Sequence, residues 1–166
     1  MTMQGVTVTP KFTFGVKGDM KNALHLMEDK KLLYVAGHNI IIYNTDEGTQ
    51  FFIQGSSNAD AINFITVSPG ARYLAYCERG ETRAQVTIYE IPNRKKKRTL
   101  PDPEMSVEVP ISAKEFAACA FSPVQDKPHL VTLSGEPDWR IIIWQWDKFS
   151  MLSNHALDVT DAVSSQ

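Results

Sequence analysis

The chain has little of what usually identifies a metal site, a membrane span or a secreted protein. Its two cysteines, Cys77 and Cys119, lack the spacing of metal ligands and lie within apolar stretches, so we expect buried free thiols and, from them, a cytosolic compartment. No apolar run approaches the roughly 18 residues that a membrane span needs. The first residues show no basic stretch followed by an apolar one, so no secretory signal is expected.

Residues arranged for catalysis or cofactor binding are also scarce. The nine glycines are dispersed and none precedes Lys-Ser or Lys-Thr, which excludes a phosphate-binding glycine loop. The four histidines stand singly, without a second ligand at metal-binding spacing. With 17 basic and 19 acidic residues, the overall charge favours neither a nucleic acid nor an anionic membrane as partner. We therefore expect no enzymatic activity, no cofactor and no bound metal.

What the sequence does contain is a repeated unit. Ser68-Pro69 and Ser122-Pro123 each follow an apolar stretch and precede another apolar strand, a glycine and a strand that ends in an aromatic residue. That aromatic residue is Tyr89 in one copy and Trp144 in the next, 21 and 22 residues after the serine, and a partial earlier copy ends at Tyr43. Because each serine precedes proline in a predicted turn and lacks a nearby base, we expect turn hydroxyls, not nucleophiles.

The length of the repeat predicts the fold. The aromatic residues recur after 46 and 55 residues, and each unit holds several short strands, as in propeller blades of four antiparallel strands. We therefore predict an all-β fold, a β-propeller of WD40-like four-stranded blades, with about three blades present. Because propellers close with roughly four to eight blades, the predicted ring is incomplete, and we expect the chain to be part of a longer protein.

The predicted divisions follow the repeat. They are an N-terminal segment at 1–19 whose residues 11–16 form a ring-closing strand, blade one at 20–60, blade two at 61–114, blade three at 115–153, and the start of a further unit or a tail at 154–166. Blade two includes a basic turn and a proline-rich excursion at 101–110. Strands are expected at 23–27, 32–36, 40–44, 50–54, 62–67, 73–77, 85–91, 98–100, 116–121, 130–133, 141–146 and 148–152.

The ends of the third strands resemble WD repeats. Each aromatic residue stands where such a repeat carries its Trp-Asp pair. In that family an Asp in the turn before this strand bonds to a His at the start of the unit. Only blade three offers such an aspartate, Asp138, while the expected histidine positions hold Asn58 and Ser112. The resemblance therefore implies blades that depend on packing. The residues assigned a structural role in the blades are Ser68, Pro69, Tyr43, Tyr89, Ser122, Pro123, Asp138 and Trp144.

Over residues 12–153 the order of features is similar to the amino-terminal end of axonemal WD-repeat proteins. The segments that carry this resemblance are Gly37-His38-Asn39, Ser68-Pro69, Arg72-Tyr73-Leu74-Ala75, Thr87-Ile88-Tyr89-Glu90, Ala120-Phe121-Ser122-Pro123 and Trp144-Gln145-Trp146. It implies a non-enzymatic scaffold of the ciliary or flagellar axoneme that helps place inner dynein arms and regulatory complexes on doublet microtubules. The implied partners are dynein or regulatory-complex subunits, tubulin, and the remainder of its own longer chain, with no membrane.

One basic run stands out between the third and fourth strands of blade two. It consists of Arg94, Lys95, Lys96, Lys97 and Arg98. It is either a solvated turn, an electrostatic contact with an acidic partner such as a tubulin surface, or a nuclear-import signal. A nucleic-acid role would need interleaved aromatic residues on the same face, and none are seen. Two alternatives stay open: a WD-like propeller of a translation or RNA-associated factor, and a non-catalytic propeller that accompanies an enzymatic domain.

Overall fold

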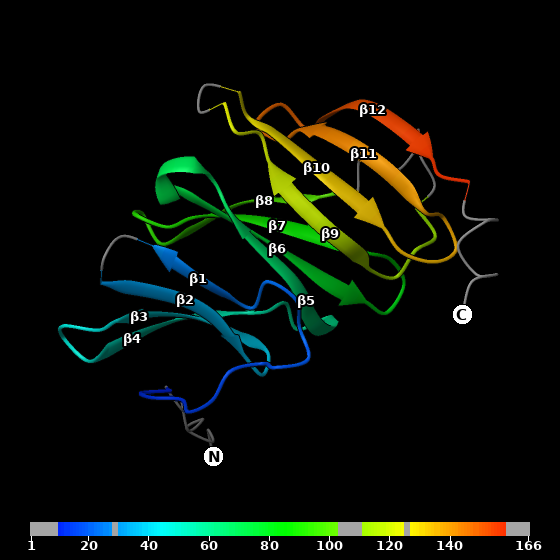
Figure 1. Cartoon of the computed structure of the whole chain (residues 1–166). Helices are drawn as coiled ribbons and strands as arrows, with labels where there is room; N and C mark the ends of the chain where they lie inside the picture. Colours follow the sequence, from blue (N-terminus) through cyan, green and yellow to red (C-terminus); the bar gives the residue numbers. More distant parts are fainter. Residues whose placement is uncertain (1–9, 28–29, 103–110, 125–126, 159–166) are drawn as a thin grey trace, which may run out of the picture.

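The computed structural model describes residues 10–27, 30–102, 111–124 and 127–158. In this part the chain forms three four-stranded antiparallel sheets, each built from four consecutive strands (Figure 1). Blade one contains β1 (Leu24–Met27), β2 (Lys31–Ala36), β3 (Asn39–Asn44) and β4 (Thr49–Gln54). Blade two contains β5 (Ala59–Val67), β6 (Tyr73–Gly80), β7 (Gln85–Glu90) and β8 (Lys95–Leu100). Blade three contains β9 (Phe116–Phe121), β10 (His129–Ser134), β11 (Arg140–Gln145) and β12 (Ser150–Ala156).

The prediction of an all-β fold with three four-stranded blades is confirmed. The sheets lie face against face and do not close into a ring (Figure 1). The first strands β5 and β9 of blades two and three pack against each other, and the fourth strands lie at the far edges of their sheets. In the part of the chain that is described, no helix is long and apolar enough to cross a membrane.

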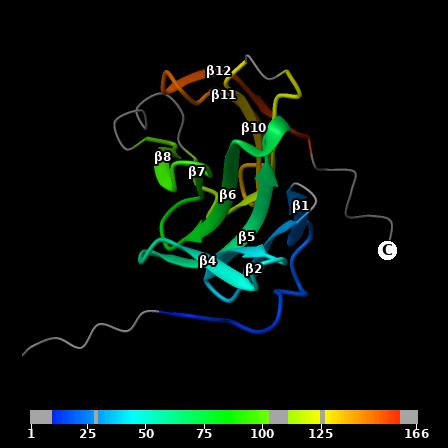
Figure 2. The ribbon, with the colours of Figure 1, turned by 90° about the vertical axis from the view of Figure 1, so that its left-hand side faces the viewer.

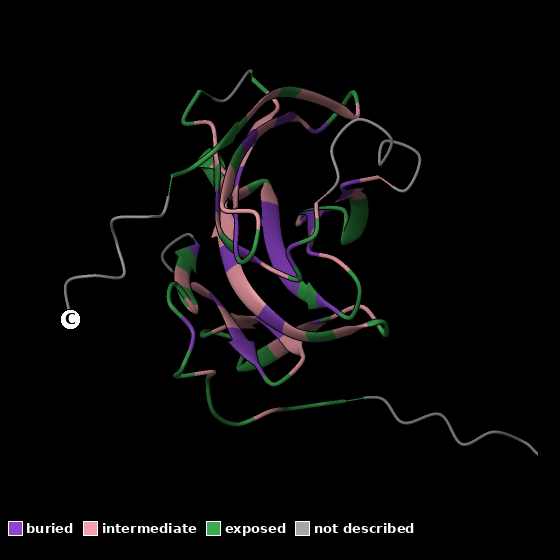
Figure 3. Cartoon of the chain, turned by 90° about the vertical axis from the view of Figure 1, so that its right-hand side faces the viewer, coloured by how far each residue is buried: buried purple, intermediate pink, exposed green. Residues whose placement is uncertain are grey.

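Burial along the third strands depends on how many neighbours a blade has (Figure 3). In the middle blade every residue from Val86 to Glu90 is buried, because one neighbouring sheet covers each face. In blade three Ile142 is fully buried while Ile141 remains 37% exposed, because only one face meets another sheet. The continuous apolar pattern of these strands is thus that of a sheet buried on both sides, which blade two shows over five consecutive residues of β7.

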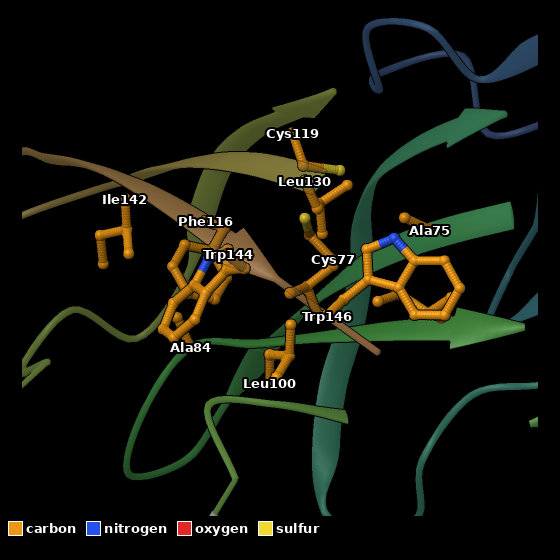
Figure 4. Packing of buried hydrophobic residues seen from close by; sticks show 12 residues of the cluster. Ala75, Cys77, Ala84, Leu100, Phe116, Cys119, Leu130, Ile142, Trp144 and Trp146 are labelled. Atoms are coloured by element: carbon orange, nitrogen blue, oxygen red, sulfur yellow. The ribbon is translucent and has the colours of Figure 1, made fainter. Parts of the chain in front are cut away.

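Two apolar cores join the three sheets, one at each blade junction. Between blades two and three, Phe116, Leu130 and Ile142 are completely buried and Trp144 is nearly so (Figure 4). Cys77 and Cys119 belong to the same core, and both are buried free thiols, as expected from the sequence. Apolar packing at the two junctions therefore holds the three sheets together.

The expected ring-closing strand at residues 11–16 is not a strand in the structure. The segment crosses beneath blade one (Figure 1 and Figure 2), where the backbone N–H of Thr13 donates to Gln50 Oε1 at 2.8 Å and the backbone N–H of Lys17 donates to the Val35 carbonyl at 2.7 Å. The blade that such a strand would complete is not among the three described sheets, and no ladder of backbone bonds forms along the segment. Its apolar side chains stay exposed, with Phe14 at 88% and Val16 at 55%, and only Phe12 reaches blade one, where its ring meets that of Tyr43 edge to face.

Two further boundaries differ from the prediction. The last strand of blade three is displaced toward the C-terminus and ends at Ala156, which pairs with Arg140, so residues 154–156 complete this blade and do not begin a new unit. The fourth strand of blade two begins at Lys95, three residues earlier than expected. The remainder of the proposed tail, at 159–166, and most of the proline-rich excursion, at 103–110, lie outside the described residues.

Candidate functional site

A carboxylate of blade three binds the linker that joins blades two and three. Asp138 lies in the turn before β11, and its Oδ2 accepts hydrogen bonds from the backbone N–H groups of Ser112 at 2.6 Å and Ala113 at 2.8 Å. Ser112 is the position where the WD pattern places a histidine. No Asp-His bond forms at this junction, and apolar packing is supplemented by a bond that the sequence did not predict, because the linker backbone supplies the donors that the missing imidazole would have supplied.

A carboxylate of blade two likewise binds the linker that joins blades one and two. Glu78, on β6, is completely buried and accepts from the backbone N–H of Ser56 at 2.6 Å and from its hydroxyl at 2.8 Å. Gln85 donates to the same carboxylate at 3.1 Å, and His38 Nε2 lies 3.0 Å from the Ser56 carbonyl oxygen. The contact thus falls at Ser56, not at Asn58, which is exposed.

Sequence reasoning missed Glu78 and the role of His38. Glu78 directly follows the predicted strand at 73–77 and precedes Arg79, so the sequence indicated a solvated strand end; in the structure β6 extends to Gly80, and the buried carboxylate must find donors. His38 follows a glycine in a turn of blade one, and its contact with the next blade depends on folding that brings residues 38, 56 and 78 together. Spacing along the chain alone does not reveal such a contact.

The aromatic residues that end the third strands are increasingly buried along the chain. Tyr43 is half-buried, Tyr89 is 7% exposed and Trp144 is 2% exposed. Trp144 also donates its indole N–H to the hydroxyl of Thr132 on the neighbouring strand, at 2.8 Å. These three residues therefore contribute to packing and to one buried hydrogen bond, and they are not surface contacts.

The two Ser-Pro turns use their hydroxyl groups locally. Ser68 Oγ accepts the backbone N–H of Tyr73 at 2.9 Å, and Pro69 begins a short 3-10 turn. Ser122 Oγ accepts the backbone N–H of Val124 at 3.2 Å, and Pro123 is exposed beside it. Among the described residues, the hydrogen bonds of both serine hydroxyls are to backbone N–H groups and none is to a base, so the geometry is that of a turn and offers no activated nucleophile.

The basic run is mostly strand and not the turn that the sequence indicated. Lys95 to Arg98 lie in β8, and only Arg94 precedes it. The guanidinium of Arg94 stacks over the ring of Phe51 in blade one, 4.4 Å from its centroid. Arg98 stacks over Phe149 in blade three at 3.9 Å. The two ends of the run therefore hold the middle blade to both of its neighbours.

The centre of the run meets a buried carboxylate. Lys97 Nζ lies 2.8 Å from Oε2 of Glu90, and Arg72 approaches Oε1 of the same group at 3.1 Å. Hydrogen bonds from Lys97 and Asn93 lower the pKa of Glu90 to about 2. Glu90 is therefore ionised in the folded protein at neutral pH, and Lys97 is committed to it.

Two cations of the run remain available. Lys95 and Lys96 are exposed on β8, and neither forms an ion pair with a described residue. Within the same described residues, no group of three or more His, Cys, Asp or Glu side chains is arranged to hold a metal ion. The site that the geometry offers is thus a small basic surface on an outer strand.

The fold and the blade junctions define this chain as a segment of a WD40-like propeller. Its fold is similar to that of a chain in the crystal structure of the mitotic checkpoint complex, with a TM-score of 0.62 and 12% identity over 95% of this chain and 48% of that one. At this identity the likeness concerns the fold alone. No protein-family model matches the sequence.

The curated relatives are proteins of cilia and flagella. The chain is 30% identical over 154 residues to cilia- and flagella-associated protein 57 of Mus musculus, covering 91% of the chain and 12% of the relative. It is 30% identical over 139 residues to cilia- and flagella-associated protein 44 of the same organism, covering 84% of the chain and 7% of the relative. The expected relation to axonemal WD-repeat proteins, and with it a location in the cilium or flagellum, is confirmed.

Proposed function

We propose that the chain is a non-enzymatic interaction scaffold of the ciliary or flagellar axoneme. The relation to cilia- and flagella-associated proteins supports the location, and the propeller fold supports a rigid surface for other proteins. The more specific role is to help place inner dynein arms and regulatory complexes on doublet microtubules. The chain spans 12% and 7% of the length of the two relatives, so for this chain the role of a whole axonemal protein is itself proposed.

The exposed cations of β8 carry this proposal. Lys95 and Lys96 lie on the outer strand of the middle blade, where no further strand of the described chain pairs with β8. Their charges are not neutralised by a described carboxylate, so they attract an acidic surface at low ionic strength. Tubulin is one candidate partner, and dynein or regulatory-complex subunits are others.

The open faces of the end blades support a second kind of contact. Ile141 and Leu152 of blade three are 37% and 49% exposed, and Leu24 and Leu26 of blade one are 58% and 70% exposed. In a propeller such faces are covered by neighbouring blades. We propose that the remainder of a longer chain covers them.

Co-sedimentation with purified doublet microtubules tests the basic surface. The double variant K95E/K96E should bind about five- to tenfold more weakly, because two exposed attractive pairs, each worth roughly 0.2–1 kcal/mol, are lost and replaced by repulsion. The matched control K114E/K148E changes two exposed lysines on other elements. Raising the salt concentration should weaken the parent chain and bring it toward the variant.

The same variants decide between the scaffold and the RNA-associated alternative. Phe51 and Phe149, the rings beside the basic strand, are already stacked under Arg94 and Arg98, so base stacking is not available there. Salt-sensitive binding to single-stranded RNA, lost in K95E/K96E, without binding to doublets would overturn the scaffold proposal. Equal doublet binding by K95E/K96E and the control would remove the basic surface from it.

A further inference from the structure

Two thiols from different blades lie in the core between blades two and three. Cys77 is on β6 and Cys119 is on β9, and they are the only two cysteines of the chain. Cys77 is completely buried and Cys119 is 5% exposed. Any disulfide within the chain must therefore join these two residues, and it would join two blades.

Strand alternation directs both side chains into the same core. On β6, Leu74 and Tyr76 belong to the core shared with blade one, whereas Ala75 and Cys77 belong to the core shared with blade three. On β9, Cys119 belongs to this second core as well. Because successive side chains of a strand point to opposite faces of its sheet, the two thiols enter the core from facing sheets (Figure 4).

The two thiols are within hydrogen-bonding reach of each other. Burial raises the pKa of the Cys77 thiol, and a hydrogen bond with the Cys119 thiol raises it further. Ala75, which shares a face of β6 with Cys77, is small and completely buried, so little side-chain volume separates the sheets beside the thiols. A disulfide between two packed sheets is an established arrangement in β-sandwiches. The pair therefore has the burial and the contact that an inter-sheet disulfide needs.

Polar contacts hold the two strands together at one end. The backbone N–H of Gly80, the last residue of β6, donates to the Lys114 carbonyl at 2.9 Å. Arg79 pairs with Glu115 at 2.6 Å, directly before β9 begins. Both contacts join β6 to the segment that leads into β9. They therefore fix the position of Cys119 relative to Cys77 in the folded chain.

We propose that Cys77 and Cys119 form a modification site, at which a peroxide oxidises the two thiols to a disulfide that links blades two and three. The sulfur of Cys119, the less buried thiol, attacks one oxygen of hydrogen peroxide. An S–O bond forms, the O–O bond breaks, and the thiol proton leaves with the other oxygen as water. The sulfur of Cys77 then attacks that of Cys119. The S–S bond forms, the S–O bond breaks, and a second water carries away the Cys77 proton.

Burial makes this oxidation slow and conditional. The thiolate is the reactive form, and burial disfavours it, so the reaction proceeds mainly when the junction opens locally. In a reducing compartment the pair stays in the thiol form, and a disulfide there is transient. Once formed, the bond restricts the unfolded chain between β6 and β9 and so stabilises the contact of the two blades. This inference does not depend on the proposed scaffold function.

Equilibration of the full chain with reduced and oxidised glutathione tests whether the fold favours the bond. Mass spectrometry of digests quantifies the peptide that links Cys77 to Cys119, in buffer and in concentrated urea. The ratio of disulfide to dithiol should be at least about tenfold higher in the folded chain, because a bond that fits the native geometry stabilises the folded state. An equal or lower ratio in the folded chain would show that the native geometry opposes the bond, and would overturn the proposal.

Treatment of the reduced chain with hydrogen peroxide tests the reaction itself. The parent chain should lose the mass of two hydrogen atoms, and its melting temperature should rise by about 5 °C or more. C77S and C119S each retain one thiol, and they should gain oxygen without forming a link within the chain. Sulfinic acid at both cysteines of the parent, or links between chains in place of the internal one, would contradict the proposal. Both measurements on the parent chain stand even if neither variant folds.

Discussion

Removing the carboxylate of Asp138 should separate blade three from its linker. In D138A, the backbone N–H groups of Ser112 and Ala113 lose their acceptor. Ser112 is exposed, so water replaces most of its bond, whereas Ala113 is completely buried and its donor stays unpaired. A hydrogen bond to a charged group contributes about 1.5–3 kcal/mol, so we expect a loss of about 2–3 kcal/mol in the free energy of unfolding.

Urea unfolding of the full chain measures this loss. The midpoint of D138A should fall at an unchanged m-value, and its melting temperature should fall by about 5–10 °C, given roughly 2–4 °C per kcal/mol for a chain of this size. D147A is the matched control, because Asp147 is exposed and belongs to the Trp146-Asp147 pair, which matches the WD letters only by chance. Equal midpoints for D138A and D147A would refute the proposed role of Asp138.

Three further outcomes follow from the junctions. Lys97 lowers the pKa of Glu90 to about 2, so the contribution of Glu90 to stability is complete above roughly pH 4.5 and is lost as the pH falls toward 2. The difference in unfolding free energy between the parent and E90Q, measured with urea, should therefore vanish near pH 2. A difference that stays constant with pH would contradict the pairing. A Cβ at Gly55 would lie 2.3 Å from His38 Nε2, so G55A should destabilise the chain by about 1 kcal/mol, and much less in an H38A background, in a double-mutant cycle. Burial raises the pKa of the Cys77 thiol, so labelling by a thiol reagent should be slow in the folded chain and rapid in urea; fast labelling without denaturant would show that the core opens.

The stacking of blades could be predicted because local patterns determine it. Apolar strands separated by turn residues, repeated with an aromatic residue at a fixed place, require sheets that bury both faces against like neighbours. Tyr89 and Trp144 lie near the ends of the third strands that the sequence indicated, and all twelve expected blade strands have a counterpart in the described structure. The predicted strand limits were less accurate where a strand consists mainly of charged residues, as in β8.

The basic strand shows why such limits fail. Lysine is depleted in strands, so Lys95 to Lys97 favoured a turn in the sequence. An outer strand needs only one apolar face, and here Leu100 supplies buried contact while Lys95 and Lys96 face solvent and Lys97 pairs with Glu90. At residues 11–16, alternation predicted a ring-closing strand, and no described sheet provides the blade that it would complete. Pairing is a property of the assembled sheets and is not encoded in one segment.

The blade junctions explain why the letters of the WD pattern can be lost while the blades persist. What the junction requires is a carboxylate of one blade bonded to donors on the linker that enters it. Asp138 finds them in two backbone N–H groups, and Glu78 finds them in the backbone and hydroxyl of Ser56. Backbone donors are present whatever the side chain, so a histidine at Ser112 is dispensable provided that the linker is held against the turn. What matters at such a junction is the position of the acceptor, so a search for Trp-Asp and Gly-His pairs will overlook blades that satisfy the same requirement with other residues.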